Sequence, residues 1–180
     1  MSKLEELEIV LQNINILKNF YIEDEWKQKM NLLVHKIINA KKIFVFGVGR
    51  SGYVGRSFAM RLMHLGFNSY FVGDTTTPSY EKDDLLILIT GSGKTESVLI
   101  VAKKAKKINN NIVAIVCESG SIIKLVDLTI QLPIKKSNYL PMGTAFEEMA
   151  LIFLDLVIAE IMKKLNLDES EIIKRHCNLL

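Results

Sequence analysis

Five short apolar segments, alternating with segments of helical character, constrain the fold of this chain more than any other feature. The apolar segments span residues 43–46, 69–72, 85–89, 112–117 and 128–132. Short runs that are largely apolar are typical of strands buried on both faces of a parallel sheet. Helical stretches fill most of the gaps, at residues 52–65, 96–107 and 121–126. This alternation predicts an α/β fold with helices on both faces of the sheet.

Further helices are expected on either side of this alternating core. Apolar residues recur at helical spacing from Leu4 through Leu7 and Leu11 to Ile14, and a second helix is predicted over about residues 24–39. After the fifth strand, a loop at residues 133–143 precedes a strongly apolar helix. We expect that helix over residues 145–165, followed by a short terminal helix near residues 169–175.

The length and composition of the chain indicate one folded domain. We predict N-terminal helices at 1–40, a sheet core and long helix at 41–165, and a C-terminal helix and tail at 166–180, all in one domain of residues 1–180. Hydrophobic residues make up 49% and charged residues 24%, which is the balance of a folded soluble protein. A net charge of +3 is too small to indicate nucleic-acid binding, but it would not repel an anionic metabolite.

The cysteines and the apolar runs point to a reduced, aqueous location. Cys117 and Cys177 are far apart in the sequence, so neither a zinc pattern nor a disulfide framework is predicted. The chain begins Met-Ser-Lys, unlike a secretory signal. Its longest apolar run, residues 151–159, is interrupted by Asp155 and is too short to span a bilayer. We therefore expect a cytoplasmic protein without a membrane segment.

A first glycine-rich turn, residues 47–52, follows the first strand and opens a helix. Its sequence, Gly-Val-Gly-Arg-Ser-Gly, has the form G-x-G-x-x-G of dinucleotide-binding turns. Asp74 lies near the end of the second strand, about where an acidic ligand of a ribose would be. This pattern alone leaves two interpretations open, a dinucleotide site and a tight turn with a purely structural role.

A second turn, residues 90–97, follows the third strand and favours a phosphate ligand. Gly93-Lys94-Thr95 imitates the end of an ATP-binding loop, but the first glycine of that motif would fall at Leu88, so the motif fails on spacing. Free backbone N–H groups at a helix start attract anions, and hydroxyl side chains add hydrogen-bond donors. The hydroxyl side chains of this turn are Thr90, Ser92, Thr95 and Ser97. Ser92 or Thr95 could alternatively serve only as a helix cap.

The two turns are expected to share one crevice. In an open parallel sheet, ligands bind beyond the carboxyl ends of the strands where the strand order reverses. If the strands lie in the order 2-1-3-4-5, the first and third strands flank that point. Both turns would then face the same ligand.

With these two turns, the sequence resembles the sugar isomerase (SIS) domain family, and within it the 6-phospho-3-hexuloisomerases. Three further segments carry the resemblance, at residues 57–67 (SFAMRLMHLGF), 141–147 (PMGTAFE) and 176–179 (HCNL). The resemblance covers nearly the whole chain. It implies a three-layer α/β/α fold with a five-stranded parallel sheet, homo-oligomers that are tetramers with active sites near subunit interfaces, and neither metal nor other cofactor.

The resemblance also implies an activity and a set of binding residues. The reaction converts 3-hexulose 6-phosphate to fructose 6-phosphate after formaldehyde fixation, or runs in reverse towards pentose phosphate. A sugar phosphate and further copies of the chain are the expected partners, without nucleic acid. Ser92, Thr95 and Thr90 would hold the phosphate, and Ser51 would contact the sugar. The predicted binding site also includes Gly47, Arg50, Gly93 and Ser97 of the same turns.

Glu147 is the candidate base. Moving a ketone by one carbon requires a group that removes a proton beside the carbonyl and returns it to the neighbouring carbon. The residues at helical spacing from Glu147 are apolar, and partial burial would make its carboxylate a stronger base. Thr144 and Glu147 also have capping-box spacing, in which the glutamate only ties down the helix start. The residues leave both roles open, and the resemblance favours catalysis.

His176 is the candidate acid for opening the sugar ring. Fructose 6-phosphate can close to a furanose, and histidine titrates in the range that ring opening needs. His176 could instead be a surface residue that stabilises the end of a short helix. A terminal tail is poorly placed to fold over its own domain, so we expect His176 to reach the crevice of a neighbouring subunit. His64, on an apolar helical stretch, is predicted to be a packing residue.

Two other functions fit the same turns. A pentose 5-phosphate aldose–ketose isomerase would use them in the same way. A regulator that only binds a sugar phosphate would usually add a DNA-binding helix-turn-helix region. The first 40 residues contain no basic recognition helix, which disfavours the regulator.

Overall fold

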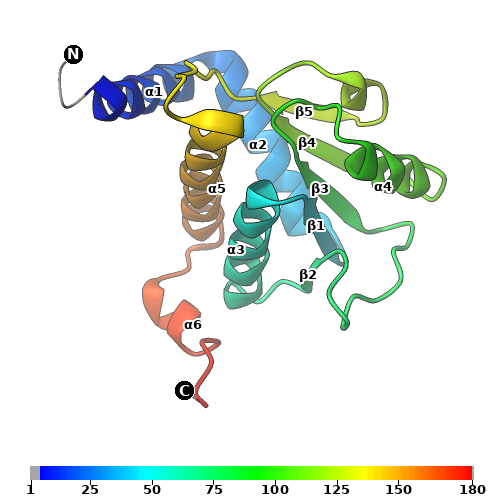
Figure 1. The fold of residues 1–180 in the computed structure, drawn as a ribbon. Coiled ribbons are helices and arrows are strands. Elements are labelled where there is room, and N and C mark those ends of the chain that lie inside the picture. Colours follow the sequence, from blue (N-terminus) through cyan, green and yellow to red (C-terminus); the bar gives the residue numbers. More distant parts are fainter. Residues whose placement is uncertain (1–4, 180) are drawn as a thin grey trace.

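The computed structural model describes residues 5–179 and contains a five-stranded parallel sheet (Figure 1). The strands lie in the order β2-β1-β3-β4-β5, which confirms the predicted fold and strand order. They are β1 (Ile43–Gly47), β2 (Ser69–Phe71), β3 (Leu85–Ile89), β4 (Ile112–Val116) and β5 (Leu128–Gln131).

The central strands are apolar along their whole length because both faces of the sheet are covered. Every residue of β3 and β4 is buried, whereas the edge strands β2 and β5 keep partly exposed positions. Side chains along β3 alternate between the two faces. Ile87 and Ile89 join one apolar core, and Leu86 and Leu88 join the other.

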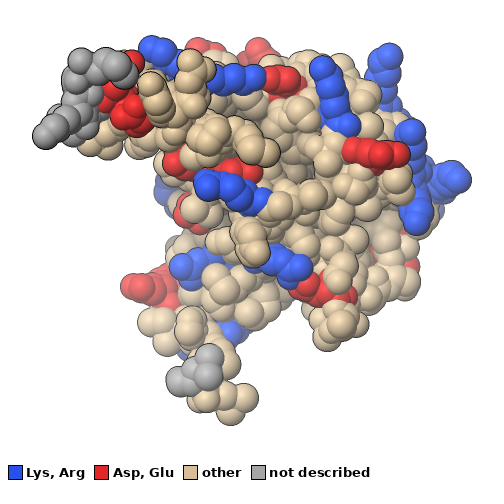
Figure 2. Space-filling model, in the orientation of Figure 1, with Lys and Arg blue, Asp and Glu red and all other residues tan. Residues whose placement is uncertain are grey.

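Helices form a layer on each face of the sheet (Figure 1). Three helices, α2 (Asp24–Asn39), α3 (Arg50–His64) and α5 (Thr144–Leu165), pack on one face, and α4 (Glu96–Lys106) packs on the other. Within residues 5–179, no helix is both long and apolar enough to cross a membrane. In Figure 2, basic side chains gather over α4, whose last turn carries exposed lysines. Over the rest of that view, acidic and basic side chains are interspersed.

The first helix, α1 (Glu5–Ile22), packs on α5 through few side chains. Leu17 is buried, and the amide of Asn13 exchanges hydrogen bonds of 3.0 and 2.7 Å with the backbone of Lys135. Leu7 and Leu11, which predicted this helix, are about half exposed. Leu4 lies outside the described residues. The periodicity therefore identified the helix, but the apolar stripe is not its buried side.

Several boundaries differ from the sequence prediction. Residues 121–126 form only a 3-10 turn, η1 (Ser121–Lys124), closed by a bond between residues three apart, from the N–H of Leu125 to the carbonyl of Ile122. The loop before α5 ends in a second such turn, η2 (Pro141–Gly143). The terminal helix α6 (Glu169–Ile173) is shorter than predicted.

Candidate active site

The two glycine turns begin side by side. Gly47 at the end of β1 is paired with Ile89 at the end of β3. A side chain on Gly47 would lie 2.8 Å from the carbonyl oxygen of Ser51 and 3.0 Å from that of Ile89, so only glycine fits there. β1 connects to β2 on one side and neighbours β3 on the other, so the strand order reverses at this point. Both turns therefore emerge at the switch point where a shared crevice is expected from the sequence.

The first turn passes directly into α3. Gly49 has a φ of 59°, a left-handed conformation that glycine adopts without strain. The helix begins at Arg50, two residues earlier than predicted, which places Arg50 and Ser51 in its first turn. Their side chains therefore project from the N-terminal turn of α3, next to the point where the strand order reverses.

Glu147 faces this first turn from α5. Its carboxylate is 8% exposed and accepts a hydrogen bond of 2.5 Å from Nε of Arg50. The Ser51 hydroxyl lies 3.4 Å from the other carboxylate oxygen. An arginine–carboxylate hydrogen bond is both strong and directional, so it orients the carboxylate towards the first turn of α3.

The capping-box interpretation of Glu147 is wrong. The residue before α5 is Gly143, which offers no side-chain cap. Thr144 lies inside the helix, and its hydroxyl donates to the carbonyl of Pro141 at 2.7 Å. The carboxylate of Glu147 bonds to α3 instead of to the start of its own helix.

The second turn presents hydroxyl groups and free backbone donors before α4. Thr90 is buried, and its hydroxyl lies 3.3 Å from that of Thr95. The hydroxyl of Ser92 accepts a hydrogen bond of 3.2 Å from the N–H of Lys94. Thr95 immediately precedes the helix but makes no side-chain capping bond, and Ser97 is exposed in the first helical turn. The N-terminal N–H groups of α4 therefore lack a side-chain cap, as an anion site requires.

Gly120, which lies outside both turns and was not singled out by the sequence analysis, packs against the second turn. The carbonyl of Gly93 accepts a hydrogen bond from Ile122, 3.0 Å away. A side chain on Gly120 would lie 2.4 Å from the backbone of Ser92 and Gly93, closer than any real contact. The spacing of the motif gave no signal for Gly120, since it belongs to a different loop that meets the turn only in the folded chain.

His176 is not brought to Glu147 of the same chain. Its ring stacks on that of buried His64, with 5.3 Å between the ring centroids. His64 ends α3, whose other end carries Arg50. A helix of this length extends roughly 20 Å. His176 and Glu147 therefore lie at opposite ends of α3. His64 is buried, as predicted for a packing residue, but among the described residues its Nδ1 has no hydrogen-bond partner, so it is not a satisfied one.

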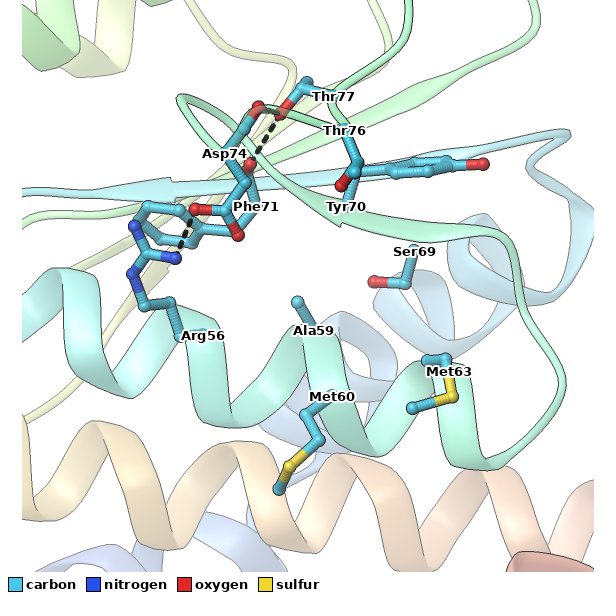
Figure 3. Close-up of a pocket in the computed structure, with 10 residues that line it drawn as sticks. All are labelled: Arg56, Ala59, Met60, Met63, Ser69, Tyr70, Phe71, Asp74, Thr76 and Thr77. Atoms are coloured by element: carbon cyan, nitrogen blue, oxygen red, sulfur yellow. Dashed lines mark hydrogen bonds and ion pairs between the residues drawn. The ribbon is translucent and has the colours of Figure 1, made fainter. Parts of the chain in front are cut away.

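A separate pocket of about 250 Å³ lies along the side of α3, next to the edge strand β2 (Figure 3). Asp74, the expected ribose ligand, forms an ion pair there with Arg56, which also stacks on the ring of Phe71 at 4.1 Å. Ala59 and Met60 extend the pocket down the helix, away from the glycine turns. With its carboxylate already paired, Asp74 does not support the dinucleotide interpretation. Among residues 5–179, no group of three or more His, Cys, Asp or Glu side chains could hold a metal ion.

Residues 36–156 match the family model of the SIS domain. The chain belongs to the SIS domain family. It is 78% identical over the full length of both chains to a Methanocaldococcus jannaschii protein named 3-hexulose-6-phosphate isomerase. A Bacillus subtilis protein of the same name is 38% identical, with 96% of this chain and 97% of the relative covered.

The fold of this SIS domain protein is also found in a solved structure. A crystal structure from Methanococcus jannaschii, for which the molecular function of 3-hexulose-6-phosphate isomerase was inferred, superposes with a TM-score of 0.96. The two sequences are 78% identical, and the match covers 98% of this chain and 99% of the other.

The contact beneath the second turn predicts a specific effect of Gly120→Ala. The added methyl group would displace Ser92 and Gly93, so we expect the affinity for inorganic phosphate to fall about tenfold. Isothermal titration calorimetry with inorganic phosphate measures this effect. Gly73→Ala is the control, because nothing lies within 4 Å of an added methyl group there, while its φ of 103° makes alanine more strained than at Gly120, whose φ is −86°. Wild-type affinity in Gly120→Ala would contradict the supporting role.

The environment of His64 predicts a pH-dependent stability. Burial lowers the pKa of His64, and the neighbouring Arg61 and His176 lower it further. The unfolded chain then binds more protons than the folded one at pH values below about 6.5, so the free energy of unfolding falls as the pH drops through that range. When unfolding by urea is measured at a series of pH values, the free energy of unfolding should depend less on pH for His64→Gln than for wild type. An equal dependence in both proteins would rule out His64 as the source.

Proposed function

We propose that this protein is a 3-hexulose-6-phosphate isomerase, which interconverts that sugar and fructose 6-phosphate through an enediol. The observation that carries the proposal is the nearly buried carboxylate of Glu147, oriented by Arg50 beside two glycine turns at the point where the strand order reverses. The names of the relatives support the same substrate.

The proposed mechanism uses one carboxylate for both proton transfers. Glu147 removes the proton from carbon 2 of the 3-ketose, and the electron pair forms the enediolate between carbons 2 and 3. The proton then returns to carbon 3, while the hydroxyl proton on oxygen 2 passes to oxygen 3 and leaves the ketone at carbon 2. The Arg50 side chain is 63% exposed, so its remaining N–H groups can donate to the enediolate oxygens.

The phosphate is proposed to bind at the start of α4. Thr90, Ser92 and Thr95 supply hydroxyl groups, and the turn around Gly93 supplies backbone N–H groups at the positive end of the helix dipole. Gly47 and Ser97 complete the binding site, and Ser51 contacts the sugar. None of these steps uses a nucleotide or a metal ion.

His176 is proposed to act across a subunit interface. Within one chain it lies at the far end of α3 from Glu147, so a His176 that opens the sugar ring at this site must come from a neighbouring copy. We infer a tetramer that brings the two residues together, formed by single-domain chains of residues 1–180 in the cytoplasm. The reaction would follow formaldehyde fixation or run in reverse towards pentose phosphate.

Glu147→Gln tests the base directly. We expect kcat to fall about 10²- to 10⁴-fold, because the amide cannot accept the proton. An assay that follows fructose 6-phosphate formation measures the change, with urea unfolding as a check on stability. Asp155→Asn, an exposed carboxylate on the same helix, serves as the control and should keep wild-type turnover. Near-normal turnover in Glu147→Gln would end the proposal for this residue.

Mixed oligomers test where His176 acts. His176→Gln and Glu147→Gln should each be nearly inactive alone. If one chain supplies Glu147 and its neighbour supplies His176, then refolding the two variants together creates some intact sites and restores about a quarter of wild-type activity. Full activity of His176→Gln alone would remove its catalytic role, and inactive mixtures would place it in its own chain's site.

A further inference from the structure

Phe146 links the phosphate turn to the helix that carries the base. It directly precedes Glu147 and is 3% exposed. Its ring lies against Gly91, where an added side chain would be 3.1 Å from Cδ1 and 3.4 Å from Cγ of the ring. The first turn of α5 therefore rests on the backbone of the second glycine turn.

The two sides of this contact make independent hydrogen bonds. The carbonyl of Gly91 accepts hydrogen bonds from the N–H groups of Cys117 and Glu118, at 2.9 and 2.8 Å, which ties the turn to the end of β4. On the other side, Glu147 is held by Arg50. The bond to Arg50 does not by itself fix the position of Glu147, since the Arg50 side chain is 63% exposed and can move with it. The ring of Phe146 fills the space between Gly91 and the start of α5, so its size sets the distance between the phosphate turn and the Glu147 carboxylate.

This distance matters because fructose 6-phosphate can enolise in two directions. Its ketone at carbon 2 acidifies the single proton on carbon 3 and also the two protons on carbon 1. Enolisation towards carbon 3 leads to the 3-ketose, and enolisation towards carbon 1 leads to aldose phosphates. With the phosphate held in place, the reacting pair of carbons shifts along the chain by roughly 1.5 Å, the length of one carbon–carbon bond. A displacement of that size is enough to change a proton-transfer rate about 100-fold.

We propose that Phe146 is a positioning residue that selects carbon 3 over carbon 1 by fixing the span from the bound phosphate to the Glu147 carboxylate. The inference rests on the proposed function. Phe146 touches neither the phosphate nor the reacting carbons, and it acts through Gly91 and Glu147. The site thereby excludes aldose–ketose isomerisation of the same six-carbon phosphate.

Two substitutions alter the contact from opposite sides. Phe146→Leu removes the ring that rests on Gly91, so the base can move towards the phosphate turn. Gly91→Ala inserts a methyl group 3.1 Å from the ring, so Phe146 and the start of α5 must move away from the turn. Phe153→Leu is the matched control, because Phe153 is fully buried further along α5 and packs against Trp26 with 5.5 Å between the ring centroids.

The test follows hydrogen exchange into fructose 6-phosphate in ²H₂O by NMR, position by position. Wild type and Phe153→Leu should exchange at carbon 3 with little exchange at carbon 1. In Gly91→Ala and Phe146→Leu, we expect exchange at carbon 3 to slow about 100-fold and its ratio to exchange at carbon 1 to fall. Glucitol 6-phosphate, which has no ketone, should bind Phe146→Leu with wild-type affinity, because the phosphate turn itself is intact.

The outcomes separate this inference from the proposed function. Exchange at carbon 3 by wild type, with an unchanged ratio of carbon 3 to carbon 1 in both variants, would overturn the role of Phe146 and leave the isomerase intact. A parallel loss of glucitol 6-phosphate binding and exchange would also overturn it, since that result marks a disrupted phosphate site. If wild type shows no exchange at carbon 3, the proposed isomerase activity itself fails.

Discussion

Strands β1 and β3 pair in register, so that Gly47 at the end of one lies beside Ile89 at the end of the other. The two polar turns of the chain start from these positions, although some 40 residues of sequence separate them. The backbone of each turn is packed so closely that side chains are excluded at Gly47 and Gly120. The rest of the candidate site depends on this pairing, because α3, which carries Arg50, and α4, whose first N–H groups are proposed to bind the phosphate, begin immediately after these turns.

The carboxylate of Glu147 contacts the first of these turns from a segment far from both of them in the sequence. α5 follows the last strand, packs beside α3, and presents Glu147 to the first turn of that helix. Burial of a carboxylate is costly unless it is paired and hydrogen bonded, and Arg50 and Ser51 meet that requirement. The rest of the Arg50 side chain is exposed, so one ion pair both stabilises the buried carboxylate and leaves N–H groups free for the proposed substrate.

Much of the fold could be predicted from the sequence, because its elements follow local patterns. The helix over residues 24–39 and the strand over residues 85–89 have the predicted boundaries, and the continuous apolar runs of the central strands identify a covered sheet. Other features depend on distant partners. The segment after β4 was predicted as a helix but is only a 3-10 turn, which bonds to Gly93 through the N–H of Ile122. The sequence also did not show which side of α1 is buried, and that helix packs through Asn13 and Leu17 while Leu7 and Leu11 are exposed.

For the site, the sequence by itself determined which chemical groups are available: two glycine turns, a set of hydroxyl groups and a glutamate near the start of an apolar helix. These are local features, and the phosphate turn follows from the residues next to a helix start. Only the tertiary structure decided that Glu147 pairs with Arg50 instead of capping its own helix. It also decided that Gly120 and Phe146 pack against the second glycine turn, and that His176 lies at the far end of α3. Each of these depends on contacts between segments distant in the chain, and such contacts are set by the packing of the helices on the sheet and not by any local pattern.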